Sequence, residues 1–173
     1  MIARLLGRDL ERPELEDVVA RLARRPDLWR PLVRHDPAER VYEELVRDNH
    51  LTVWLICWME DHDTGFHDHD RSAGAVAVAQ GEVIEDRLLL GRPPASRRFG
   101  AGRAFSFAAS DIHRVRHGGA GPAVSIHAYS PPLWRMGAYE VRADGELRRH
   151  SVSYAEELRA LPMDHEHAAA DVA

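Results

Sequence analysis

The stretch GFHDH at residues 65–69 decides how this sequence is interpreted, and short candidate strands precede and follow it. Residues two apart in a strand point to the same face, so His67 and His69 can both reach one metal ion. The alternative is a pair of surface histidines in a polar turn, because residues 61–63 read Asp-His-Asp. Neutral imidazoles suit zinc, copper, iron or nickel, and the pair alone does not choose among these metals.

Short apolar or alternating segments, separated by turn residues, continue from this stretch in both directions. Residues 52–59 form a short apolar run rich in aromatic and β-branched side chains, which is typical of a buried strand. Residues 91–94 (Gly-Arg-Pro-Pro) are interpreted as a turn, and Asp144-Gly145 as the turn of a last hairpin. The other predicted strands cover residues 73–79, 82–90, 103–108, 113–116, 123–129, 133–142 and 146–152.

The part of the chain before residue 50 carries helix signals instead. Apolar residues within 14–25 recur at i, i+3, i+4 and i+7, between Pro13 and Pro26. A second helix is predicted to open at Pro37 and to run through residues 38–46, and a short one at 154–161. The whole pattern predicts an all-β barrel or sandwich with two helices in front of it.

Length and composition predict one globular domain. The 173 residues are 45% hydrophobic and 29% charged. We expect one domain over residues 1–163, with a helical part over 1–50 and a β-barrel over about 51–152, followed by a flexible tail at 164–173. The single cysteine, Cys57, excludes an internal disulfide and a multi-cysteine zinc site.

Net charge and hydropathy limit where the protein is expected to be located and what it is expected to bind. The net charge of −5 argues against a nucleic-acid surface. No apolar run is long enough to span a membrane, and the first residues lack the apolar core of a signal peptide, so we expect a cytoplasmic protein.

Eleven histidines is a high count, and imidazole is the commonest metal ligand.

A second polar row lies in the predicted strand 123–129. Ser125, His127 and Tyr129 alternate there, so a hydroxyl, an imidazole and a phenol share one face and can form a hydrogen-bond relay. The alternative is an ordinary strand whose polar face meets solvent. A third histidine, His113, stands at the start of another candidate strand.

This layout resembles the two motifs of the cupin superfamily, in which an HxH block and a glycine precede a second block with a histidine. Cupins usually add a glutamate ligand after HxH, whereas the matching position here is Gly74. Three histidines without that glutamate resemble the thiol dioxygenases of the cysteine dioxygenase type. The block SIHAYSPP at 125–132 is similar to that family's S-x-H-x-Y-S-P-P signature, and residues 56–58 resemble the strand before its iron site. The implied fold is an all-β cupin barrel, a jelly-roll-like double-stranded β-helix, with N-terminal helices.

The resemblance implies a chemistry and a set of site residues. It implies Fe(II) as the cofactor, a small thiol and O2 as partners, and transfer of both oxygen atoms to sulfur to give a sulfinate. The implied metal ligands are His67, His69 and His113. The implied catalytic row is Ser125, His127 and Tyr129, in which His127 orients the tyrosine. Ile56, Trp58 and Phe66 are expected as apolar walls of the substrate site, and Trp54 as part of the core.

Two departures from the family bear on the substrate. Mammalian cysteine dioxygenases carry a cysteine, crosslinked to the tyrosine, at the position of Gly74, so that crosslink is impossible here. Cysteine-specific members hold the substrate carboxylate with an arginine at the position where Glu43 falls, and Arg40 and Arg47 are off register. We therefore expect Glu43 to contact a non-cysteine thiol, such as an ergothioneine-type thioimidazole, or Arg135 to bind 3-mercaptopropionate.

Several alternatives stay open at the level of sequence. The alternatives to a non-cysteine thiol dioxygenase are a true L-cysteine dioxygenase that uses another arginine, a non-catalytic metal-binding cupin, and a nickel or manganese cupin enzyme. The row formed by Ser125, His127 and Tyr129 argues against the second, and the missing glutamate ligand argues against the third. The sequence leaves the oligomeric state open between monomer and dimer.

Overall fold

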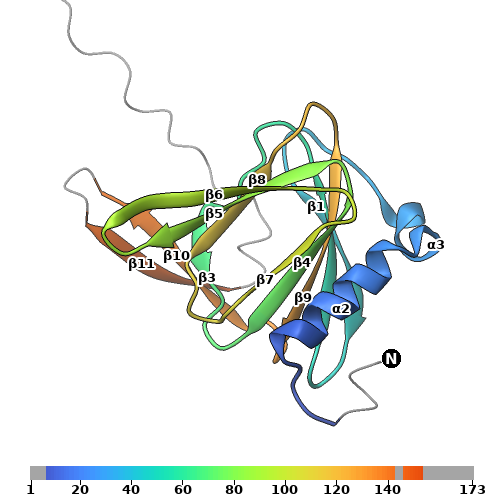
Figure 1. The fold of residues 1–173 in the computed structure, drawn as a ribbon, viewed down its shortest axis with the longest axis horizontal. Coiled ribbons are helices and arrows are strands. Elements are labelled where there is room, and N and C mark those ends of the chain that lie inside the picture. The colour runs from blue at the N-terminus through green and yellow to red at the C-terminus, as the bar shows by residue number, and fades with distance from the viewer. Residues whose placement is uncertain (1–6, 143–145, 154–173) are drawn as a thin grey trace, which may run out of the picture.

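The computed structural model describes residues 7–142 and 146–153, which form two facing β-sheets with a helix packed outside one of them (Figure 1). The first sheet has the order β1-β2-β9-β4-β7, and the second has the order β11-β10-β3-β8-β5-β6. The strands of the first sheet are β1 (Val41–Arg47), β2 (Thr52–Trp58), β9 (Ala123–Ser130), β4 (Ala73–Gln80) and β7 (Ala104–Phe107). Those of the second are β11 (Leu147–Ser153), β10 (Arg135–Val141), β3 (Phe66–Asp68), β8 (His113–His117), β5 (Glu82–Leu89) and β6 (Arg92–Gly100).

The N-terminal helix forms where the sequence predicts it. Helix α2 (Arg12–Ala23) begins with a capping box, in which the side chains of Glu11 and Glu14 bond each other's backbone. Its buried face, with Leu15 and Val19 at its centre, packs on the outer face of the first sheet beside β4 and β9 (Figure 1). The short helix α3 (Pro26–Trp29) and a 3-10 turn, η1 (Arg30–Leu32), follow it.

The predicted second helix is wrong, because residues 41–47 form the edge strand β1. This strand pairs with β2 in antiparallel fashion, and its register shifts between Glu44 and Val46. A bulge of this kind inserts one residue and so changes which residues share a face. Val41 therefore lies on the same side of β1 as Val46, although an odd number of positions separates them. The sequence of this strand for that reason does not show a strict alternation of apolar and polar residues.

The central strand β2 divides the apolar residues into two clusters. All seven of its residues are buried. Val53, Leu55 and Cys57 join the cluster under α2. Trp54, Ile56 and Trp58 belong to the second cluster, together with residues from both sheets such as Phe105, Phe107 and Met136. The space between the two sheets is therefore filled largely by apolar side chains, and the polar site described below lies among them.

The remaining predicted strands are confirmed, and one strand was missed. Strand β6 begins at Arg92, inside the segment interpreted as a turn. The two prolines are tolerated there because β6 is the edge of the second sheet and because its pairing with β5 is irregular at this place, between Arg87 and Leu89. The predicted turn at 144–145, the helix at 154–161 and the tail at 164–173 lie outside the described residues.

None of the helices within residues 7–142 and 146–153 has both the length and the apolar character that a membrane crossing requires.

Candidate metal centre and adjoining pocket

Three buried histidines meet between strands β3 and β8. His67 lies in β3, His69 follows that strand directly, and His113 begins β8. His67 and His113 are register partners across the two strands. The ring centroids are 4.8 to 5.1 Å apart, and one ring nitrogen from each residue lies within 4.8 Å of the others. The three residues named from the sequence as metal ligands are thus brought to one point.

Hydrogen bonds outside the cluster fix the tautomers of two of these rings. The Nδ1 atom of His67 lies 3.0 Å from the carbonyl oxygen of Gly65, and that of His113 lies 3.0 Å from a carboxylate oxygen of Glu85. Both partners can only accept, so each Nδ1 carries the proton and donates it. The lone pair of each ring is then on Nε2, the atom left to bind a metal ion.

Several ring nitrogens in this cluster are buried without a partner. Within the described part of the chain, neither nitrogen of His69 has a hydrogen-bond partner, and Nε2 of His113 has none. Such nitrogens are costly to bury unless something binds them. Two of the three imidazoles have their second nitrogens held by a carbonyl or a carboxylate, and all three place an unpartnered or metal-facing nitrogen at one point, so the residues present fit a metal ion.

Burial also keeps these histidines in the form that binds metals. It lowers the pKa of His67 and of His69 well below the usual value, and the neighbouring histidines lower it further. Burial lowers the pKa of His113 as well, although Glu85 acts in the opposite direction. The imidazoles are therefore neutral at pH 7, and a metal ion has no proton to displace from them.

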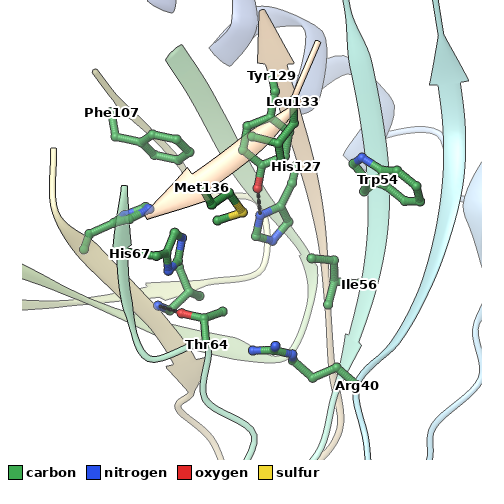
Figure 2. A pocket seen from close by; sticks show the side chains of 12 residues that line it. Arg40, Trp54, Ile56, Thr64, His67, Phe107, His127, Tyr129, Leu133 and Met136 are labelled. Carbon is green, nitrogen blue, oxygen red and sulfur yellow. Dashed lines mark hydrogen bonds between the residues drawn. The ribbon is translucent and has the colours of Figure 1, made fainter. Parts of the chain in front are cut away.

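A pocket opens beside the histidines and is lined mostly by apolar side chains (Figure 2). It has about 540 Å³ of empty space, including its open mouth. Figure 2 shows His67, Arg40 and Tyr129 on different sides of this space. The lining residues are Arg40, Trp54, Ile56, Thr64, His67, Phe107, His113, Val115, His127, Tyr129, Leu133 and Met136.

The polar row on β9 forms a directed chain of hydrogen bonds behind this pocket. The indole N–H of Trp58 donates to Oγ of Ser125 at 2.8 Å, and that oxygen lies 2.7 Å from Nε2 of His127. An indole only donates, so Oγ of Ser125 accepts from Trp58, and the same oxygen contacts the ring of His127. Nδ1 lies 3.4 Å from the hydroxyl of Tyr129, a long contact that the dashed line of Figure 2 marks. Burial lowers the pKa of His127 to about 3, so the ring stays neutral.

The cation of the pocket is Arg40, although its position in the sequence is off register with the arginine of cysteine-specific family members. Its side chain is 5% exposed, its Nη1 donates to the carbonyl of Asp63 at 2.8 Å, and its guanidinium lies 5.7 Å from the ring centre of Trp58. Arg40 directly precedes β1, whose first residue, Val41, is the register partner of Cys57. If residues 41–47 had been predicted as a strand paired with β2, Arg40 would have been placed at the site.

Two residues predicted to bind substrate do not line this pocket. Glu43 shares a face of β1 with Val41, toward the cluster under α2, and forms an ion pair with Arg34. The expectation for Glu43 came from matching residues 45–46 to the family's apolar pair, whereas the strand leaves Glu43 outside the residues that line the pocket. Arg135 is half exposed and lies 3.4 Å from a carboxylate oxygen of Asp70.

The predicted apolar walls are placed differently from one another. Ile56 lines the pocket, and so does Trp54, which was expected to be core alone. Trp58 is fully buried behind Ser125, and Phe66 is half buried on the outside, with Arg114 stacked 5.0 Å from its ring centre. Leu133, Met136 and Phe107 complete the wall and were not singled out from the sequence.

Gly74 leaves space that Phe107 fills. These two residues are register partners, and a Cβ atom at position 74 would lie 2.4 Å from the phenyl ring. That ring stacks on His69, with centroids 4.4 Å apart, and lies 4.3 Å from the ring of His113. The position where cupins usually place a glutamate ligand is thus occupied by an aromatic wall.

Comparisons with known proteins agree with this architecture. The sequence model of the family "cysteine dioxygenase type I" matches residues 6–142. The chain is 24% identical over 141 residues to cysteine dioxygenase type 1 of Danio rerio, which covers 75% of this chain and 70% of that protein.

Solved structures confirm the predicted cupin fold. A Thermus thermophilus protein gives a TM-score of 0.51 at 22% identity and covers 59% of this chain and 92% of its own. A Klebsiella pneumoniae protein with a double-stranded β-helix domain gives 0.52 at 17% identity, with 59% and 80% covered. A cupin superfamily protein of Desulfitobacterium hafniense gives 0.51 at 11% identity, with 60% and 87% covered.

Proposed function

Because this chain belongs to the cysteine dioxygenase type I family, we propose that it is an Fe(II)-dependent thiol dioxygenase that converts a small thiol and O2 to a sulfinate. Family membership makes it an oxidoreductase of the dioxygenase class. The observation that carries the finer proposal is the cluster of three neutral, buried histidines that opens onto a pocket with Arg40 and Tyr129.

The ligand set supports iron with open coordination positions. His67, His69 and His113 would hold the ion, and among the described residues no carboxylate or thiol joins their group. Bound Fe(II) would supply the charge that ionises the thiol and the redox chemistry that O2 requires. Every other contribution below comes from the protein's own side chains.

Arg40 supports a substrate that carries a carboxylate. A guanidinium presents two parallel N–H donors that match the two oxygens of a carboxylate, and burial strengthens this pairing. Among the described residues that line the pocket there is no aspartate or glutamate, so a cationic substituent would find no anion there. We therefore favour a carboxylate-bearing thiol, and 3-mercaptopropionate fits this lining best because, unlike L-cysteine or an ergothioneine-type betaine, it carries no cation.

Tyr129 would act at the opposite side of the pocket. We propose that Ser125 donates its proton to Nε2 of His127, so that Nδ1–H of His127 donates to the phenol oxygen. Its own O–H is then directed to the substrate side, where it can donate to an oxygen that becomes negative during the reaction. His127 would be the positioning residue that holds this orientation.

Oxygen consumption by the iron-loaded protein tests the proposal. We expect uptake of one O2 per sulfinate formed, detected by mass, with L-cysteine or 3-mercaptopropionate. Cysteamine, which lacks the carboxylate, is expected to react poorly. No uptake with any thiol would refute dioxygenase activity and leave a metal-binding cupin, and preference for cysteamine would refute the role of Arg40.

A further inference from the structure

Glu85 is a buried carboxylate that no part of the mechanism above uses. It lies in β5, its side chain is 0% exposed, and it is bonded to three other side chains. One oxygen accepts from Nδ1 of His113 at 3.0 Å and from Arg87 at 2.7 Å, and the other accepts from Arg97 at 2.6 Å. The carboxylate therefore connects a candidate metal ligand to a half-exposed arginine on the edge strand β6.

The three histidines differ in what holds their outer side. Nδ1 of His67 donates to a backbone carbonyl, and His69 has ring contacts but no hydrogen bond on either nitrogen within the described residues. His113 is the member of the group whose partner is a carboxylate. A carboxylate behind an imidazole raises the electron density on the other ring nitrogen and fixes the ring's orientation.

We propose that Glu85 is a positioning residue that orients His113 and strengthens it as a ligand, with Arg87 and Arg97 setting how much negative charge reaches the ring. The inference rests on the metal site of the proposed function. Arg87 also bonds Asp111 and the carbonyl of Ser106, so it anchors the carboxylate to the loop before His113. Arg97 reaches the carboxylate from the surface, and its side chain is half exposed.

The neighbouring residue provides a matched control. Asp86 is equally buried, at 2% exposed, and bonds Arg114 at 2.7 Å, Arg116 at 2.9 Å and Ser96. It lies next to Glu85 on the same strand, yet within the described residues no hydrogen bond or ion pair joins it to a histidine. Glu85→Gln and Asp86→Asn therefore each remove one buried charge from β5, and only the first removes it from a candidate ligand.

Binding of Co(II) to the apo-protein, measured by competition with a chelator, tests this assignment. Glu85→Gln is expected to raise the Kd by about 10- to 100-fold, whereas Asp86→Asn stays within about twofold of wild type. An equal effect in both variants, or none in Glu85→Gln, would overturn the role of Glu85. Failure of the wild type itself to bind one Co(II) would instead refute the metal site, so the two failures are distinguishable.

A surface variant decides the matter if Glu85→Gln does not fold. Arg97→Gln removes a half-exposed cation that partly neutralises the carboxylate, so it is expected to lower the Kd for Co(II) by about two- to threefold. Its control is Arg98→Gln, because Arg98 pairs with Glu82 at the surface and does not contact Glu85. A Kd for Arg97→Gln equal to or above that of Arg98→Gln would overturn the proposal.

Discussion

At the scale of single residues, the site depends on polar atoms whose partners are fixed by burial. Tyr129 is 7% exposed, and His127 and Ser125 behind it are 3% and 0% exposed. Buried polar groups joined in a row depend on one another's hydrogen bonds, so we expect a substitution in the row to affect the next side chain as well. This makes single-atom substitutions informative tests of the proposed chemistry.

Tyr129→Phe removes one hydroxyl and keeps the ring that packs against Phe107. We expect iron binding to stay as in wild type and kcat to fall by about 10²-fold, because one positioned donor to developing charge is lost. The measurements are the iron content of the purified protein and the rate of O2 uptake. Tyr42→Phe, on a ring that packs edge-on against Trp54, is the control, and an unchanged kcat in Tyr129→Phe would exclude the phenol from the mechanism.

Arg40→Gln removes the cation of the pocket. We expect the KM for a carboxylate-bearing thiol to rise and kcat/KM to fall by about 10²-fold or more, since breaking a buried charge pair costs about 2–5 kcal/mol. Iron content should not change. Arg34→Gln and Glu43→Gln alter the ion pair on the other face of β1 and are expected to keep the wild-type KM. A raised KM in Glu43→Gln alone would restore the sequence-based assignment of that residue.

The residues of this site were predictable to very different degrees. His67 and His69 follow from the period of a strand, and the row on β9 follows in the same way. Arg40 was not predicted because its position at the pocket depends on strand β1, for which the sequence predicted a helix. Phe107 was not predicted because its role depends on the space left by the missing side chain of Gly74. Local periodicity thus finds ligands on regular strands but not residues placed by pairing across the sheet.

Gly74→Ala tests that close packing. A Cβ atom 2.4 Å from the ring of Phe107 requires the ring to move, so we expect a loss of about 1–3 kcal/mol in the free energy of unfolding. The double variant Gly74→Ala/Phe107→Leu should recover part of the loss, and urea unfolding measures both. Gly100→Ala, where a Cβ atom would meet nothing within 4 Å, is the control. An equal effect at positions 74 and 100 would contradict the packing argument.

At the scale of elements, the hairpin β10–β11 holds the strand that carries the histidines. Asp68, between His67 and His69, accepts two hydrogen bonds from Arg149 of β11, at 2.7 and 3.0 Å, and one from Tyr139 of β10 at 2.6 Å. Strand β3 has only three residues, so its own ladder bonds are few. The ion pair therefore supplies much of what fixes β3 against its neighbours.

Removal of this ion pair is expected to loosen the histidine strand. In Arg149→Gln the buried carboxylate of Asp68 loses its charged partner, and we expect a loss of about 1–3 kcal/mol in stability, since Arg149 is partly exposed. Metal affinity should fall as well, because the two histidines flank Asp68. Urea unfolding and Co(II) titration measure the two effects. Arg148→Gln, an exposed neighbour on β11, should change neither, and equal results for the two variants would contradict this role.

Central strands were easier to predict than the strands at the edges of the two sheets. Strands with a clear apolar character, such as β2 and β9, lie where the sequence places them. The two errors fall on the outer strands β1 and β6, where a bulge or two prolines replace the usual pattern. Edge strands tolerate both because their free side has no ladder to satisfy, and this same tolerance removes the signal from the sequence.

At the scale of the whole molecule, stability should depend on pH in two separate ranges. The buried carboxylates Asp68, Glu85 and Asp86 are opposed by burial, which raises the pKa, but their arginine and hydrogen-bonding partners outweigh it and hold each pKa at about 2. The unfolded chain binds protons at these groups near their ordinary pKa of about 4. Their contribution is therefore complete above about pH 5 and is lost as the pH falls toward 2.

The buried histidines add a second range at higher pH. Burial lowers the pKa of His67, His69, His113 and His127, so each ring stays neutral in the folded state. In the unfolded chain the same rings take up protons below their ordinary pKa of about 6.5. The unfolded state then binds more protons than the folded state, and stability falls with falling pH.

We therefore expect the urea midpoint of the apo-protein to fall in two steps, the first below about pH 6.5 and the second below about pH 4.5. In Asp86→Asn the second step should shrink and the first should stay, because only a carboxylate is removed. Bound metal should deepen the first step, since proton uptake by the three ligand histidines would then also release the ion. A urea midpoint of the apo-protein that stays level between pH 8 and pH 5 would contradict the neutral, buried histidine cluster on which the metal site depends.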